Sequence, residues 1–251
     1  MSQPENIKWT PLITNALLDN AYAPTTFSFG FVQSPFAEFS EAFISWNKEI
    51  FSKFGGEIEF THFSAPLPAA LLRLEPLTSP QDRYLLVETR SNWSAIFSNG
   101  LCVNDVASPV GYLPTILKCR GLNVASVPDR SDSAGKDGLQ IYGAVTFTLY
   151  GPDATDWLNR IRHVGVTKDV GGWEFAAQGE IQPYENAECY LKRRLVDRFT
   201  VEMLESYCGA LGIELFDANF FGGQCLVSHA KRSTPPGPTM SISEARSHLY
   251  L

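Results

Sequence analysis

The residues best suited to chemistry in this sequence follow a strong turn signal at residues 98–100. A cysteine beside such a turn is a candidate nucleophile when a base, here His163, lowers its pKa. The alternative is that Cys102 packs in the core as a small apolar side chain. The candidate pocket of an enzyme of unrecognised family consists of Asn99, Cys102, Asp105 and Tyr112.

Acidic residues in loops form a second group of candidates. Two carboxylates about 5–10 Å apart can act as acid and base in glycoside hydrolysis, although loop aspartates more commonly cap helices or form turns. Aspartates also steer a basic protein partner towards a binding surface, and aromatic side chains supply contact energy there. The expected partner contacts are Trp93, Asp105, Asp129, Asp132 and Asp137, three of them in the polar loop 128–138.

Motifs that bind phosphates, metals or acyl groups are missing from the sequence. It lacks G-x-x-x-x-G-K-[ST], G-x-G-x-x-G and G-x-S-x-G. Its four histidines are far apart in the sequence, and it has no C-x-x-C, H-x-x-x-H or H-E-x-x-H pair. We therefore expect no metal and no cofactor.

Composition narrows the class of protein further. The chain has 251 residues, 44% of them hydrophobic, and a formal net charge of −7. Nucleic-acid binding is disfavoured, because phosphates require a basic surface. The five cysteines are widely spaced, which favours reduced thiols in the cytoplasm over a disulfide framework. Neither a signal peptide nor a long apolar run is present, so we expect a cytoplasmic protein that does not contact a membrane.

The elements that must position these residues alternate between strands and helices. Residues 84–89, 93–97, 122–127 and 141–149 read as strands, and residues 108–120 read as a helix. A second helix is predicted from Ser34 to Gly55, with six large apolar side chains on one stripe. Further helices are predicted over residues 186–199 and from Thr200. The irregular order predicts an α+β fold with a mixed, mostly antiparallel sheet covered by amphipathic helices.

One domain boundary is expected near the C-terminus. Residues 1–228 carry the alternating strands and helices and should form a single α+β domain. Residues 229–251 are rich in proline and serine, with consecutive prolines at Pro235-Pro236, and predict a mobile tail. The sequence does not fix the oligomeric state.

Three segments together resemble a group of uncharacterised bacterial proteins with no assigned activity. They are W-S-A-I-F-S-N-G at 93–100, R-G-L-N-V at 120–124, and Y-G-A-V-T-F-T-L-Y-G-P followed by D-W-L-N within 142–159. The resemblance implies a bacterial origin. Because these motifs consist of aromatic, glycine and turn residues, they mark the fold more than a site, and no catalytic role carries over from the resemblance.

Three functional hypotheses follow from the sequence. The first is a non-catalytic cytoplasmic binding protein, in particular an immunity protein that neutralises a basic bacterial toxin. The second is an enzyme with its site in the segment Asn99–Tyr112. The third is a scaffold that acts by self-association. The acidic charge and the aromatic content favour the first hypothesis.

Overall fold

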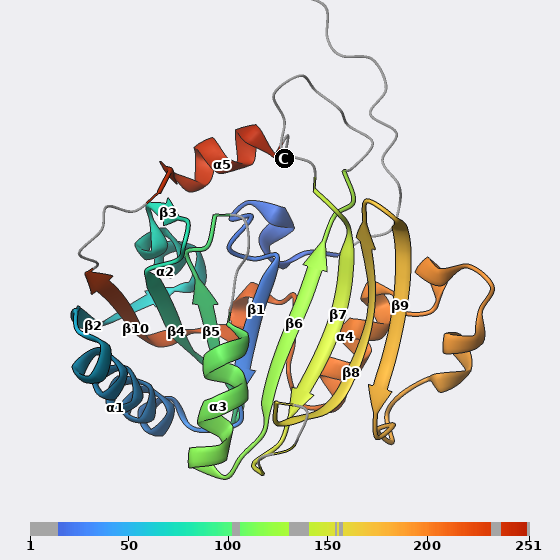
Figure 1. The fold of residues 1–251 in the computed structure, drawn as a ribbon, viewed down its shortest axis with the longest axis horizontal. Helices are drawn as coiled ribbons and strands as arrows, with labels where there is room; N and C mark the ends of the chain where they lie inside the picture. Colours follow the sequence, from blue (N-terminus) through green and yellow to red (C-terminus); the bar gives the residue numbers. More distant parts are fainter. Residues whose placement is uncertain are drawn as a thin grey trace, which may run out of the picture.

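The computed structural model describes residues 15–101, 106–130, 141–153, 155, 158–231 and 237–249. Most strands of these residues join one large sheet, and helices pack on both of its faces (Figure 1). The helices are α1 (Phe36–Phe54), α2 (Leu67–Leu71), α3 (Ala107–Leu117), α4 (Val201–Ala210) and α5 (Ile242–His248). The strands are β1 (Ser28–Val32), β2 (Glu57–Pro66), β3 (Leu77–Thr78), β4 (Arg83–Thr89), β5 (Ser94–Ser98), β6 (Gly121–Val127), β7 (Ala144–Tyr150), β8 (Arg160–Asp169), β9 (Gly172–Gly179), β10 (Phe221–Lys231) and β11 (Thr239–Met240).

The large sheet has nine strands in the order β2-β10-β4-β5-β1-β6-β7-β8-β9. Every neighbouring pair in it is antiparallel. Strands β3 and β11 form a separate antiparallel pair, and a parallel bridge joins Thr78 to Gly100. The fold is α+β with a largely antiparallel sheet, as the sequence predicts.

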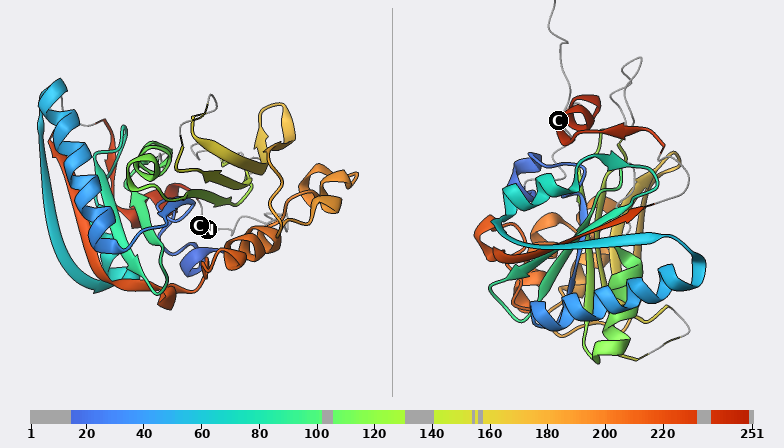
Figure 2. Two further views of the ribbon diagram at one scale, coloured as in Figure 1. Left: turned by 90° about the horizontal axis from the view of Figure 1, so that it is seen from below. Right: turned by 90° about the vertical axis from the view of Figure 1, so that its left-hand side faces the viewer.

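Helices lie on both faces of the strands in the middle of the sheet (Figure 2), and an apolar cluster lies on each face. On the front face, α1 and α3 cover Val32, Leu86 and Ile96. On the back face, α2 and α4 help to cover a larger cluster that includes Phe31 and Phe97. Strand β5 is therefore buried at all five of its positions. This two-sided burial explains why the central strands read as continuous apolar runs.

Helix α1 buries only the first half of its predicted apolar stripe. Phe36, Phe39 and Phe43 contact the front of the sheet, whereas Phe54 in the last turn is 84% exposed. Asn47 is buried in the middle of the helix, and its side-chain amide donates to the carbonyl of Phe43 at 2.8 Å. The predicted end of the helix is confirmed, since Gly55 follows it with a φ of 76°.

The C-terminal residues contain more regular structure than the sequence predicts. The expected boundary at residue 229 falls inside β10, and the chain later forms β11 and α5. Ile242 is buried, and its backbone N–H donates to Glu75 Oε1 at 2.6 Å. Leu249 is buried as well, and its carbonyl accepts a hydrogen bond from Arg130 Nη1 at 3.0 Å. Burial of these apolar side chains explains why the segment packs against the domain.

The helix predicted over residues 186–199 is replaced by two 3-10 turns. The turns span Ala187–Leu191 and Leu195–Asp197, and Lys192 and Arg194 adopt extended backbone conformations next to them. Tyr190 and Phe199 are thereby both buried, which one continuous helix would not achieve with this spacing. Within the described ranges, no helix combines the length and the apolar character needed to cross a membrane.

Candidate partner-binding surface

The front face of the sheet loses its helical cover beyond α3. Helix α3 lies over β1 and β6 and reaches β7, while no described helix covers the front of β8 and β9 (Figure 1). Three cross-strand rows of side chains, which we call the open face, run from β6 across β7 onto the uncovered strands β8 and β9. The rows are Asn123-Thr148-His163-Gln178, Ala125-Thr146-Gly165-Ala176 and Val127-Ala144-Thr167-Glu174.

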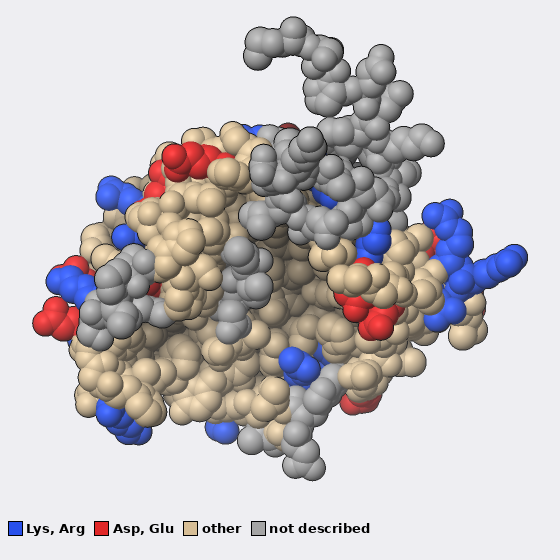
Figure 3. All heavy atoms as spheres, turned by 45° about the horizontal axis from the view of Figure 1, so that its top comes forward, with Lys and Arg blue, Asp and Glu red and all other residues tan. Residues whose placement is uncertain are grey.

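The open face consists mainly of short side chains. Its middle row contains two alanines, one threonine and one glycine, and Glu174 is the only Asp, Glu, Lys or Arg residue in the three rows. Solvent-facing strands usually carry longer charged side chains that keep other chains away. Figure 3 shows a hollow in the middle of the molecule, and the acidic and basic side chains gather around its margins.

His163 is the one ionisable imidazole on the open face. Its Nδ1 lies 2.9 Å from Thr148 Oγ1, and the two atoms share a hydrogen bond. Gly165 leaves room for the ring, because a Cβ at that position would lie 3.4 Å from His163 Nε2. Burial lowers the pKa of His163, and the charges of Arg160 and Arg162 lower it further. The imidazole is therefore neutral at pH 7 and offers a hydrogen bond without a charge.

The lowered pKa of His163 makes stability depend on pH. The unfolded chain takes up a proton near the usual value of 6.5, whereas the folded protein does so only at lower pH. Because the unfolded state then binds more protons, the free energy of unfolding falls as the pH is lowered from 7.5 to 5.5. Each tenfold difference in proton affinity between the two states corresponds to about 1.4 kcal/mol.

The variant His163→Gln isolates this effect, because glutamine keeps a polar side chain that does not titrate. We expect the wild type to lose more stability than His163→Gln between pH 7.5 and 5.5. Urea denaturation at several pH values measures the difference. Parallel stability curves for the two proteins would show that His163 has the same pKa in the folded and unfolded states.

Trp93, an expected partner contact, lies in the core. Its side chain is 1% exposed and belongs to the apolar cluster behind the sheet. Its indole Nε1 donates to the carbonyl of Leu211 at 2.9 Å, so its polar atom is satisfied inside the protein. Trp93 offers no surface to a partner in this structure. Strand β5 is buried on both faces, and alternation alone does not reveal that.

Asp129 lies at the end of the predicted acidic loop and forms a buried ion pair. Its carboxylate is 2.8 Å from Lys168 Nζ, and its side chain is 3% exposed. Lys168 also lies over the ring of Trp173, with 5.7 Å between Nζ and the ring centroid. Asp129 therefore joins the loop to β8. The other expected contacts of this group, Asp105, Asp132 and Asp137, lie outside the described residues.

Asn99, from the alternative pocket, joins several segments of backbone. Its Oδ1 accepts hydrogen bonds from the N–H groups of Asp82 and Arg83 at 3.0 and 2.9 Å. Its Nδ2 donates to Asp82 Oδ1 at 2.6 Å, the Pro76 carbonyl at 2.9 Å and Thr78 Oγ1 at 3.2 Å. Asn99 is completely buried, and these bonds leave none of its polar atoms for a substrate.

Tyr112, the other described member of that pocket, lies on the outside of α3. Its ring is 5.6 Å from the ring of Trp46 on α1, measured between centroids, and Ile116 is exposed one turn further along α3. No contact joins Tyr112 to Asn99 within the described ranges. Cys102 and Asp105, which would complete the pocket, lie outside them.

The described cysteines show no sign of activation. Cys119, Cys189, Cys208 and Cys225 are all free of disulfides. Burial raises the pKa of the Cys119 and Cys225 thiols to about 11 each, and it raises that of Cys208 as well. A thiol with a raised pKa is a poor nucleophile at neutral pH. Among the residues that the structure describes, no group of three or more His, Cys, Asp or Glu side chains is arranged to hold a metal ion.

A second hollow lies at the other end of the sheet, where β2 ends and β10 begins. This cleft has a volume of about 740 Å³. Its walls come from Ser64, Pro66 and Pro68 on one side and from Gly222 and Gly223 on the other, and Arg90 contributes a charge. The two glycines have φ values of 140° and 102° and form a bulge in β10.

Comparison with known proteins identifies no relative of this chain. No family model matches the sequence, and no curated protein or solved structure is significantly similar to it. The resemblance to uncharacterised bacterial proteins therefore stays an expectation. The fold and the surface chemistry are what support the functional proposal.

Proposed function

We propose that this protein is a non-catalytic binding protein and that the open face is where its partner docks. The observation that carries the proposal is the chemistry of the three rows. Threonine, asparagine, glutamine and neutral histidine side chains supply donors and acceptors, while glycine and alanines allow another chain to approach closely. Binding such a surface requires little rearrangement of long side chains, so little conformational entropy is lost.

The partner is expected to be a basic protein. The chain carries a formal net charge of −7, which speeds encounter with a positively charged partner. The specific form that we propose is an immunity protein that neutralises a bacterial toxin in the cytoplasm. The open face then supplies the short-range contacts, and the acidic surface supplies the long-range attraction.

A matched pair of alanine substitutions tests the role of the open face. Ala176→Arg places a long charged side chain in the middle row of β9, and Ala37→Arg places one on the exposed side of α1. We expect affinity capture from the native host to recover a stoichiometric partner with wild type and Ala37→Arg. The same partner should be lost with Ala176→Arg, provided that circular dichroism shows a folded protein.

Two outcomes would contradict the proposal. A partner that Ala176→Arg retains as well as wild type does would place the binding surface elsewhere. Recovery of no partner with the wild type would count against a binding function. If a partner is captured, its toxicity to cells in the absence of this protein tests the immunity role separately.

A further inference from the structure

Strand β2 is a long and unprotected edge of the nine-stranded sheet. It pairs with β10 over all ten of its residues, and no described strand pairs with its other side. Figure 2 shows β2 crossing the front of the right-hand view with no other ribbon over it. An exposed edge of this length is a template for pairing with another strand.

The hydrogen-bond pattern of β10 identifies which backbone groups of β2 are free. The N–H of Ala230 donates to the carbonyl of Asp82 at 2.8 Å, on the β4 side. Because successive residues of a strand point their backbone groups to opposite sides, His229 and its odd-numbered neighbours point towards β2. The β2 residues paired with them therefore form their backbone hydrogen bonds with β10. The outward-pointing backbone groups therefore belong to Ile58, Phe60, His62 and Ser64.

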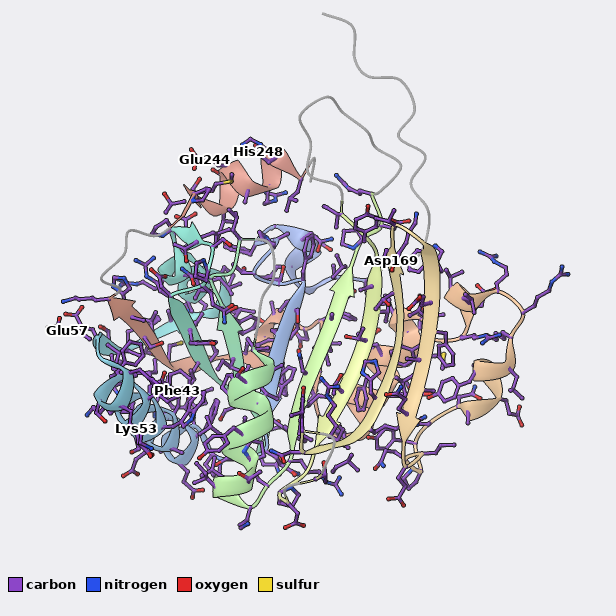
Figure 4. All side chains as sticks on the ribbon, in the orientation of Figure 1. Phe43, Lys53, Glu57, Asp169, Glu244 and His248 are labelled. Atoms are coloured by element: carbon purple, nitrogen blue, oxygen red, sulfur yellow. The ribbon has the colours of Figure 1, made fainter. Side chains whose placement is uncertain are left out.

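Three other features lie along this edge. Phe54 is 84% exposed just before β2 begins. Glu57 lies at the same end (Figure 4), and Glu57 and Glu59 share one ion-pair partner in β10, Lys231 Nζ, at 3.7 and 2.6 Å, so two carboxylates there face one ammonium group. The cleft lined by Pro66 and Pro68 opens at the opposite end of β2. Arg90 lines this cleft, and its guanidinium makes no hydrogen bond or ion pair with the described part of the chain.

We propose that two copies of this chain associate by pairing β2 with β2 in antiparallel orientation around a two-fold axis at Thr61. This register pairs Phe60 of each copy with His62 of the other, and Ile58 with Ser64, so the free backbone groups satisfy one another. Glu57 and Glu59, at the start of each β2, then lie near the end of β2 in the other copy, where Arg90 lines the cleft. Phe54 just before β2 and the cleft just after it lie at opposite ends of the strand, so the antiparallel arrangement brings Phe54 of each copy towards the cleft of the other.

The sequence of β2 favours a second copy of itself over an unrelated strand. In this register Glu57 lies opposite Ala65 and Glu59 opposite Phe63, so no two carboxylates face each other. The two-fold axis repeats each contact in the two copies: the exposed Phe54 with the cleft, and Arg90 with the acidic end, where Lys231 balances only one of the two carboxylates. Sedimentation of the wild type is expected to show a dimer that dissociates on dilution.

The variant His62→Pro tests the backbone pairing directly. Proline removes the N–H that points outward and leaves the hydrogen bonds between β2 and β10 in place, as is tolerated on an edge strand. We expect His62→Pro to raise the dimer dissociation constant at least about tenfold, since two hydrogen bonds are lost per dimer. His62→Ala keeps the N–H and is expected to retain most of the wild-type affinity. Analytical ultracentrifugation measures both, and circular dichroism confirms that both are folded.

Phe54→Ser provides a second test that leaves the monomer fold intact, because the side chain is 84% exposed. We expect this variant also to weaken the dimer. A wild type that is monomeric up to the submillimolar range would overturn the proposal. So would His62→Pro and Phe54→Ser variants that dimerise as tightly as the wild type does. The Ala176→Arg variant should remain dimeric, which separates this test from that of the open face.

Discussion

Replacing Glu185 by alanine is expected to lower the free energy of unfolding by about 3–5 kcal/mol, because the Arg162 guanidinium then stays buried without a counter-charge. Glu185 accepts hydrogen bonds from Arg162 Nε at 2.8 Å and from Nη2 at 2.6 Å. The Arg162 side chain is 2% exposed and that of Glu185 is fully buried. After the substitution, Arg162 Nη1 keeps its hydrogen bond to the carbonyl of Gly179. Urea denaturation measures the loss.

Glu185 also joins this ion pair to neighbouring hydrogen-bond donors. Tyr190 donates its hydroxyl hydrogen to Glu185 Oε2 at 2.6 Å, and the backbone N–H of Gln182 donates to Oε1 at 2.9 Å. The hydroxyl groups of Tyr190 and Tyr207 are 2.9 Å apart. The alanine variant therefore loses several charge-assisted hydrogen bonds in a buried network.

Two comparisons make the Glu185 experiment specific. Glu49→Ala breaks an exposed ion pair with Lys53 and should change stability very little. The double variant Arg162→Met with Glu185→Leu removes both charges and should be more stable than Glu185→Ala alone. A loss below about 1 kcal/mol in Glu185→Ala would mean that water reaches Arg162 and replaces the carboxylate.

Replacing Gly121 by alanine is expected to lower the free energy of unfolding by about 3 kcal/mol, because α3 lies directly on this residue. A Cβ at Gly121 would lie 2.1 Å from the carbonyl oxygen of Val110 and 2.8 Å from Pro114 Cγ. The first contact is with helix backbone, so the helix itself has to move. Gly30 on the neighbouring strand β1 allows the same close approach, because a Cβ there would lie 2.5 Å from Val110 Cγ2. Thermal and urea denaturation measure the effect.

Gly209→Ala is the matched control for Gly121→Ala. Gly209 lies in α4, and a Cβ there would have no neighbour within 4 Å. This substitution should raise the free energy of unfolding by about 0.5–1 kcal/mol, because alanine restricts the unfolded chain and favours a helix. Equal effects of the two substitutions would show that α3 shifts at little energetic cost.

The elements with a regular apolar period could be predicted from the sequence. Residues 164–168 and 173–177 flank a turn signal at 169–172 and predict a hairpin, which β8 and β9 form. Helix α1 was expected from the three- and four-residue spacing of its phenylalanines. The predicted cap at Ser34 differs from the structure, because α1 begins at Phe36 after Pro35 and has no side-chain cap. The pattern of residue types along the sequence predicts that a helix forms more reliably than it predicts the residue at which the helix begins.

Contacts between distant segments could not be predicted in the same way. The insertion of β10 between β2 and β4 pairs residues far apart in the sequence. The ion pair between Asp129 and Lys168 depends on such a contact, and it removes Asp129 from the surface where the sequence placed it. Trp93 is buried for a related reason: it directly precedes β5, which is covered on both faces, and the pattern of residues 93–97 does not show that second cover.

The sequence carries a signal for the open face. Residues 144–149 alternate between small or polar side chains and apolar ones, which predicts a strand with one uncovered face. His163 and Thr148 both occupy the polar side of this alternation. What the sequence could not show is that α3 stops short of β8 and β9. That boundary depends on helix length and on two glycines beneath the helix.

The strand order has a consequence for the chain as it leaves the ribosome. Strands β6 to β9 are neighbours in both sequence and space, so they can pair as soon as they emerge. Strand β4 can pair with β5 early, but its other edge and all of β2 have to wait for β10, which is translated more than a hundred residues later. During that interval β2 and one edge of β4 stay unpaired and can contact other nascent chains. Chaperones are therefore expected to engage the N-terminal half of this protein during its synthesis.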